Sequence, residues 1–97
     1  MKLFLDTAII EEIDSRLSSG VISGVTTNPT LIKKSGKDPD DIYADLINDI
    51  GVKDLSIEVN GQFADQLIEN GIKYGKLWAN EATIKLPCTP EGIKACK

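Results

Sequence analysis

The segment Ala82-Thr83-Ile84-Lys85-Leu86-Pro87 decides the fold, because it places a lysine inside an otherwise strand-like run that a proline ends. Side chains along a strand alternate between two faces, so Lys85 shares a face with Thr83 while Ile84 lies on the opposite face. A central strand of a sheet covered by helices on both faces is nearly all apolar. This strand instead predicts a sheet with one apolar and one polar face.

Three similar strand-like segments precede this one, and a helical pattern of apolar residues follows each of them. Such alternation predicts parallel strands joined by helical crossovers. The polar segment 33–38 is expected to be a mobile surface loop. The predicted strands are residues 2–5, 21–25, 55–59 and 82–87, and the predicted helices are residues 9–17, 38–50, 63–72 and the segment that begins at Thr89.

Two α/β architectures fit these parallel βα repeats: a small, open, doubly wound sheet, or the first four βα units of a (β/α)8 TIM barrel, which has about 250 residues. Alternation pairs Phe4 with Asp6, Ser56 with Glu58 and Thr83 with Lys85 on one face of their strands. An ionisable group that recurs near three strand ends suits a barrel interior, whose site lies at the carboxyl ends of the strands. We therefore predict that residues 1–97 form a single partial domain, the N-terminal half barrel.

Composition narrows the classes of function. The chain has 97 residues, 41% hydrophobic and 27% charged, and its net charge of −4 comes without a basic stripe, which argues against a nucleic-acid partner. Its apolar runs are far shorter than the roughly 20 residues of a membrane span, and Asp6 comes too early for a signal peptide. We expect a cytoplasmic protein with free thiols at Cys88 and Cys96.

The chain has no histidine, which excludes Ser-His-Asp and Cys-His catalysis and leaves too few ligands for a structural zinc site. Cys88 has no histidine or arginine beside it in the sequence to activate its thiol, so we expect a small buried apolar side chain there. We expect Tyr43, Tyr74 and Trp78 to serve in packing.

Lys85 is the candidate nucleophile. Burial disfavours a charged ammonium group, and a neutral amine can attack a carbonyl to form a Schiff base. Asp6 and Glu58 are carboxylates that could move protons in such a reaction. The alternatives are an edge-strand lysine that faces water, an aspartate that caps the next helix and a glutamate exposed at a strand end.

The stretch Thr26-Thr27-Asn28-Pro29-Thr30 follows the second predicted strand. Thr26 and Asn28 offer uncharged donors and acceptors that suit a sugar hydroxyl or a carbinolamine, although an ordinary Thr/Asn/Pro loop has the same composition.

Three motifs give the chain a family resemblance. They are Asp6-Thr7-Ala8, Gly24-Val25-Thr26-Thr27-Asn28-Pro29-Thr30-Leu31-Ile32 and Ile84-Lys85-Leu86-Pro87-Cys88-Thr89 with Glu91-Gly92. In this order and spacing they resemble the transaldolase family, in particular its small bacterial-type branch, which also contains fructose-6-phosphate aldolase. The resemblance is weaker from Asn60 to Ala79.

The resemblance implies a class I aldolase barrel that uses a Schiff base and needs no cofactor and no metal. Lys85 then resembles the lysine that bonds the ketose carbonyl, and Asp6 resembles the acid/base group. Glu58 stands where transaldolases have a glutamate that acts through a water and where the aldolase branch has glutamine. Thr26 and Asn28 resemble residues of the donor site.

The implied activity is transfer of a dihydroxyacetone unit between sugar phosphates in the pentose phosphate pathway, by a cytoplasmic homo-oligomer. Family members are about twice as long as this chain, in keeping with a complete barrel, and their second half supplies the substrate-phosphate site. The alternatives are a fructose-6-phosphate aldolase-like C–C lyase and an inactive half-barrel assembly module.

Overall fold

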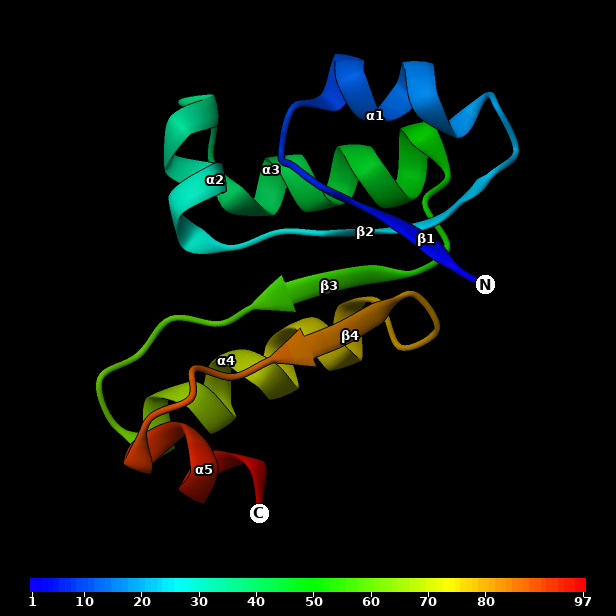
Figure 1. Cartoon of the computed structure of the whole chain (residues 1–97). Helices are drawn as coiled ribbons and strands as arrows, with labels where there is room; N and C mark the ends of the chain where they lie inside the picture. The colour runs from blue at the N-terminus through cyan, green and yellow to red at the C-terminus, as the bar shows by residue number, and fades with distance from the viewer.

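Four strands lie side by side in the order in which the chain runs, and each neighbouring pair is parallel. The computed structural model describes residues 1–97 and is drawn in Figure 1. This order lacks the reversal that defines a doubly wound sheet, so the fold is four parallel βα units in one sheet, consistent with part of a TIM barrel. The strands are β1 (Leu3–Asp6), β2 (Ile22–Thr26), β3 (Leu55–Glu58) and β4 (Ala82–Lys85).

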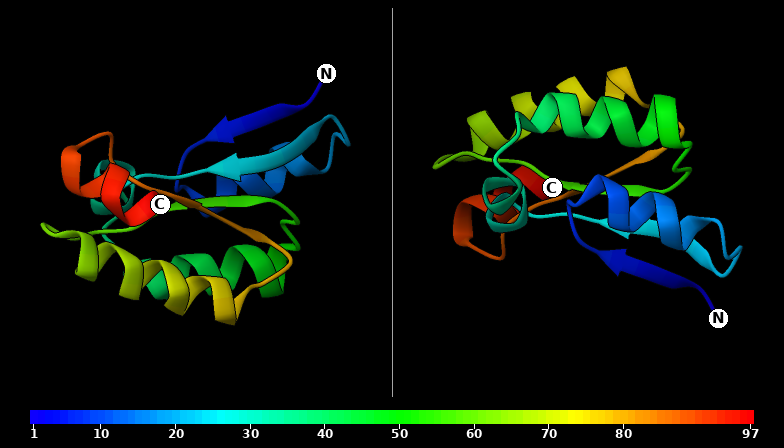
Figure 2. Two further views of the ribbon diagram at one scale, coloured as in Figure 1. Left: turned by 90° about the horizontal axis from the view of Figure 1, so that it is seen from below. Right: turned by 90° about the horizontal axis from the view of Figure 1, so that it is seen from above.

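The helices follow the strands, and α1 contributes Ile13 to the core. In Figure 2, α3 and α4 run next to each other on one side of the sheet. Figure 1 places α2 and α5 at the end of the sheet toward which β3 and β4 point. The helices are α1 (Ile10–Leu17), α2 (Pro29–Ser35), α3 (Pro39–Ala44), which continues as the π-helical turn η1 (Asp45–Ile50), α4 (Ala64–Leu77) and α5 (Pro90–Cys96). None of these helices is long and apolar enough to cross a membrane.

The hydrophobic core lies on one face of the sheet. Val25 of β2 and Leu55 and Ile57 of β3 are fully buried together with Ile13 of α1 and Leu46 of η1. This arrangement confirms the apolar face that alternation predicts for β3, and it leaves the opposite face of the sheet without a covering layer of helices.

Three helices begin with the same two-residue signal, a side-chain cap followed by a proline. The side-chain oxygens of Asn28, Asp38 and Thr89 accept backbone N–H groups at the starts of α2, α3 and α5. The helices that follow Asp38 and Thr89 were predicted from the sequence, whereas the helix that follows Asn28 was not. Residues 33–35 are therefore helical, and the prediction of a mobile loop over 33–38 is wrong for them.

Helix α4 extends five residues beyond its predicted end, to Leu77. The pair Asn70-Gly71 does not end it, because Gly71 lies against the strand β4, where an added Cβ atom would be 3.4 Å from the Ile84 side chain. The missing side chain at Gly71 lets the helix approach the sheet closely. The last turn is stabilised instead by Tyr74 and Trp78, which pack against the core.

Gly24 is required by close packing. A Cβ atom at this position would overlap both the Asp54 carbonyl oxygen and the Phe4 ring. A Cβ atom added to Gly75 in α4 would have no other atom within 4 Å, and Gly75 does not have a positive φ.

We therefore expect Gly24→Ala to lower the free energy of unfolding by about 1 to 3 kcal/mol, the usual cost of overpacking. Gly75→Ala is the matched control and should raise it by about 0.5 to 1 kcal/mol, because alanine is the better helix former. Urea denaturation of both variants measures the difference. Equal stabilities would contradict the packing assigned to Gly24.

Candidate active site

A polar row crosses the open face of the sheet. Strand pairing aligns Asp6 with Thr26, Thr26 with Ser56, and Ser56 with Thr83. Each strand contributes one member, so the row runs from edge to edge. In a barrel this face is the interior, where inward side chains from neighbouring strands form layers.

Lys85 lies at the carboxyl end of β4, in register with Glu58 of β3. Its side chain is half-buried, and its Nζ atom donates a hydrogen bond to the Thr27 carbonyl oxygen at 3.3 Å. Thr27 follows β2, so the lysine reaches past β3 across the open face. β4 is an edge strand here, but the lysine does not extend freely into water, as the edge-strand alternative would require.

Asp6 and Thr26 form the second polar contact of this face. The Thr26 hydroxyl donates to Asp6 Oδ1 at 2.9 Å. Asp6 does not cap α1, whose first turn receives no side-chain cap and instead has the Ile9 N–H bonded to the Thr7 hydroxyl at 3.2 Å. The helix-cap alternative for Asp6 is therefore wrong, and its second carboxylate oxygen has no protein partner.

Thr27 is a residue that the sequence analysis did not single out. It is fully buried, and both its N–H and its hydroxyl donate to the Ser56 carbonyl, at 3.1 and 3.0 Å. These two bonds hold the chain after β2 against β3, and the Thr27 carbonyl that receives Lys85 is held with it. The sequence pattern that could have indicated Thr27 is its position between the candidate site residues Thr26 and Asn28, at the end of a strand whose side chains alternate between the two faces of the sheet.

Glu58 and Asn28 flank this arrangement. Glu58 is half-buried, and no ion pair within 4 Å joins it to Lys85. Asn28 uses its side-chain oxygen to cap α2, accepting from the Leu31 N–H at 3.0 Å, which leaves its amide nitrogen as a free donor. The site thus offers one amine, two carboxylates and uncharged donors, a set suited to carbonyl chemistry and proton transfer.

Comparison with known proteins assigns the family. Residues 3–97 match the family model described as transaldolase/fructose-6-phosphate aldolase. The chain belongs to this family. It is 44% identical over 97 residues to a probable transaldolase of Coprothermobacter proteolyticus, 44% over 96 residues to one of Symbiobacterium thermophilum and 39% over 97 residues to one of Clostridium perfringens.

These matches cover 100%, 99% and 100% of the chain, respectively, but only 44% of each relative. The chain therefore spans less than half the length of the probable transaldolases that it matches. The alignment and the four βα units together agree with the N-terminal part of the transaldolase-family barrel.

The turn after β4 carries the rest of the third family motif. The Thr89 hydroxyl accepts the Gly92 N–H at 3.0 Å. Glu91 accepts the Ala64 N–H at 2.9 Å and the Lys94 ammonium at 3.3 Å, and these two donors lower the pKa of its carboxyl group. Both cysteines are exposed, so the prediction that Cys88 is buried is wrong. The turn places its side chain outside the core.

The aromatic residues pack together, as predicted. The rings of Tyr43 and Tyr74 meet edge to face at 5.4 Å between centroids, and Tyr74 stacks on Trp78 at 5.9 Å. Burial raises the pKa of both tyrosines, most strongly that of Tyr74, whose hydroxyl also donates to Asp40.

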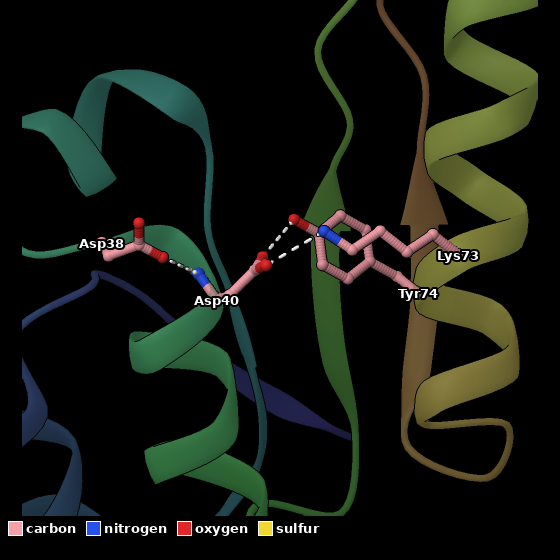
Figure 3. Close-up of polar contacts among 4 residues, drawn as sticks. All are labelled: Asp38, Asp40, Lys73 and Tyr74. Carbon is pink, nitrogen blue, oxygen red and sulfur yellow. Dashed lines mark hydrogen bonds and ion pairs between the residues drawn. The ribbon is translucent and has the colours of Figure 1, made fainter.

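Asp40 joins α3 to α4. Its carboxylate accepts the Tyr74 hydroxyl at 2.6 Å and the Lys73 ammonium at 2.9 Å, while its own N–H donates to the Asp38 side chain at 2.9 Å (Figure 3). The Tyr74 hydrogen bond, followed by that of Lys73, lowers the pKa of the Asp40 carboxyl group below 3.8. The Asp40 carboxylate therefore stays ionised at a lower pH than an ordinary aspartate does.

This contact should contribute stability in a pH-dependent way. Because the pKa of Asp40 is lower in the folded chain than its ordinary value of 3.8, its contribution is complete above that value and is lost as the pH falls through the lowered pKa. We expect Tyr74→Phe to raise the pKa of Asp40 toward 3.8, since the phenol is the strongest of its stabilising donors. Carboxyl-detected NMR titration of both proteins measures this shift. An unchanged titration in Tyr74→Phe would refute the assignment.

Proposed function

We propose that this chain supplies the Schiff-base portion of a transaldolase-type enzyme that transfers a dihydroxyacetone unit between sugar phosphates in the cytoplasm. The observation that carries the proposal is the position of Lys85. Lys85 is half-buried on the open face and in register with Glu58, and its amine donates to the carbonyl of Thr27, which directly follows Thr26 of the Thr26–Asp6 pair.

In the proposed reaction the Lys85 amine attacks the ketose carbonyl and forms a carbinolamine, which loses water to give an iminium ion. The iminium accepts the electron pair of the C–C bond between the α and β carbons as that bond breaks, and Asp6 takes the proton from the β-hydroxyl, whose oxygen becomes the aldehyde oxygen. The resulting enamine then attacks the acceptor aldehyde, whose oxygen takes the proton back from Asp6, and water hydrolyses the new iminium to release the ketose product and the free Lys85 amine. Glu58 moves the proton needed for loss of water, and Thr26 and Asn28 hold the donor hydroxyls.

The identity of residue 58 favours a transferase over a lyase. By the family resemblance, Glu58 stands where transaldolases have a glutamate and where the aldolase branch has a glutamine. Glu58 therefore supports transaldolase over fructose-6-phosphate aldolase-like cleavage. The proposed chemistry uses no metal ion.

Borohydride reduction of the chain with dihydroxyacetone or fructose 6-phosphate tests the proposal. We expect a reduced adduct at Lys85, located by peptide mass mapping, because this lysine lies on the open face at the carboxyl end of β4. Lys94, which is exposed and paired with Glu91, is an internal control within the same digest.

Lys85→Arg keeps the positive charge but cannot form the adduct, and it should abolish trapping completely. Asp6→Asn should preserve trapping and lower the rate of C–C cleavage by about 100-fold or more, the usual contribution of general acid–base catalysis. No adduct on the wild-type chain, while a full-length relative reacts in parallel, would instead support the inactive assembly module.

We also propose that the chain self-associates. Strands β1 and β4 are the edges of the four-stranded sheet, and unpaired parallel edges offer backbone groups to another strand. The Phe4 side chain is 38% exposed, which leaves apolar surface next to the β1 edge. We expect analytical ultracentrifugation to show concentration-dependent oligomers, and a monomer at all concentrations would contradict this.

A further inference from the structure

The Thr27 carbonyl lies just beyond the end of a strand ladder. The pairing of β2 with β3 ends at Thr26 and Ser56. The Thr27 N–H still donates to the Ser56 carbonyl, but no backbone N–H donates to the carbonyl of Thr27, which is fully buried. Buried backbone carbonyls are nearly always paired. The Lys85 amine pairs this one, at 3.3 Å.

Reaching this carbonyl constrains the Lys85 side chain. Strand β3 separates β2 from β4, so the contact spans two strand spacings, about 10 Å. The lysine side chain must therefore lie extended across β3. Lysine has one of the largest side-chain entropies to lose on ordering. The amine therefore keeps this position only while its acceptor is held.

The acceptor is held from both ends of its peptide bond. On one side, the Thr27 hydroxyl donates to the Ser56 carbonyl at 3.0 Å. On the other side, the Asn28 side-chain oxygen accepts the Leu31 N–H at 3.0 Å. The Thr27 carbonyl belongs to the planar peptide unit that joins these two residues. Fixing both residues therefore fixes the direction in which this carbonyl points.

A backbone carbonyl is a suitable partner for an amine that must react. A carbonyl oxygen can only accept a hydrogen bond. It therefore holds the Lys85 amine through an N–H and leaves the lone pair of the neutral nitrogen free to attack. A carboxylate in the same place would favour the charged ammonium form more strongly.

We propose that Thr27 is a positioning residue for the Schiff-base step, because its buried hydroxyl fixes the carbonyl that holds the Lys85 amine. The catalytic consequence rests on the proposed function, whereas the position of the amine is a property of the chain without substrate. Placement of a reacting group contributes strongly to rate, and a displacement of about 1 Å can lower the rate by about 100-fold.

Thr27→Val removes the hydroxyl with little other change. Valine has nearly the same shape and favours extended backbone, and the Ser56 carbonyl would still accept the N–H of residue 27. Thr7→Val is the matched control. Thr7 follows β1 as Thr27 follows β2, and its hydroxyl accepts the Ile9 N–H at 3.2 Å instead of holding a partner of Lys85.

Acetylation with a small amine reagent measures the position of Lys85 without any sugar. The rate at Lys85 relative to that at the exposed Lys94, read by peptide mass mapping, should rise about fivefold in Thr27→Val, the effect of losing one hydrogen bond. Thr27→Ser should restore the wild-type ratio, and Thr7→Val should leave it unchanged. An unchanged ratio in Thr27→Val, no rescue by Thr27→Ser or an equal rise in Thr7→Val would overturn the proposal.

Borohydride trapping with dihydroxyacetone tests the catalytic consequence. The trapping rate at saturating dihydroxyacetone should fall about fivefold in Thr27→Val, with an unchanged half-saturating concentration, and should recover in Thr27→Ser. Thr7→Val should keep the wild-type rate, which separates positioning from a general loss of stability. Equal rates in the wild type and Thr27→Val would refute a role in the Schiff-base step. If the wild type forms no adduct, the proposed function fails, and the acetylation ratios still decide whether Thr27 positions the amine.

Discussion

One-sided burial of the sheet is the constraint on which the rest of the structure depends. Val25, Leu55 and Ile57 are removed from water by α1, α3 and η1, and strand alternation then forces their neighbours to the other face. Those neighbours include Ser56 and Glu58, which bring polar groups to the open surface. Burial of one face therefore determines where the chemical groups lie, before any ligand is considered.

The chain after β2 converts this polar face into a site. The two bonds from Thr27 to the Ser56 carbonyl fasten it to β3, and the Asn28 cap turns it directly into α2. The Thr27 carbonyl is then in place to receive Lys85 from β4. Residues separated by almost sixty positions meet because parallel strands present their carboxyl ends at one edge.

The sequence-based predictions were accurate where the structure depends on residues close together in the chain, and less accurate where it depends on contacts between distant segments. All four strands were found within one or two residues, because alternation and turn residues are local signals. Helix α2 was missed although Asn28-Pro29 carries the same signal as Asp38-Pro39, because the polar residues after it resembled a loop. The end of α4 was misplaced because Gly71 serves the contact with β4, which no local pattern reveals.

The same distinction applies to the candidate site. Lys85, Asp6 and Glu58 could be selected from the sequence because an ionisable residue within a strand is unusual and alternation assigns it a face. Two features could not be selected in this way: Cys88 is exposed, and Asp6 does not cap α1. Both depend on the path of a turn after a strand, and packing elsewhere in the chain sets that path.

The sequence by itself determined the parallel βα order, the polar face of each strand and the family motifs, since these depend on local periodicity and residue identity. Only the tertiary structure decided that Lys85 bonds to the Thr27 carbonyl, that Thr26 bonds to Asp6, and that the Thr27 hydroxyl bonds to the Ser56 carbonyl. These contacts join segments far apart in the chain, and their geometry follows from strand register and helix packing rather than from any local preference.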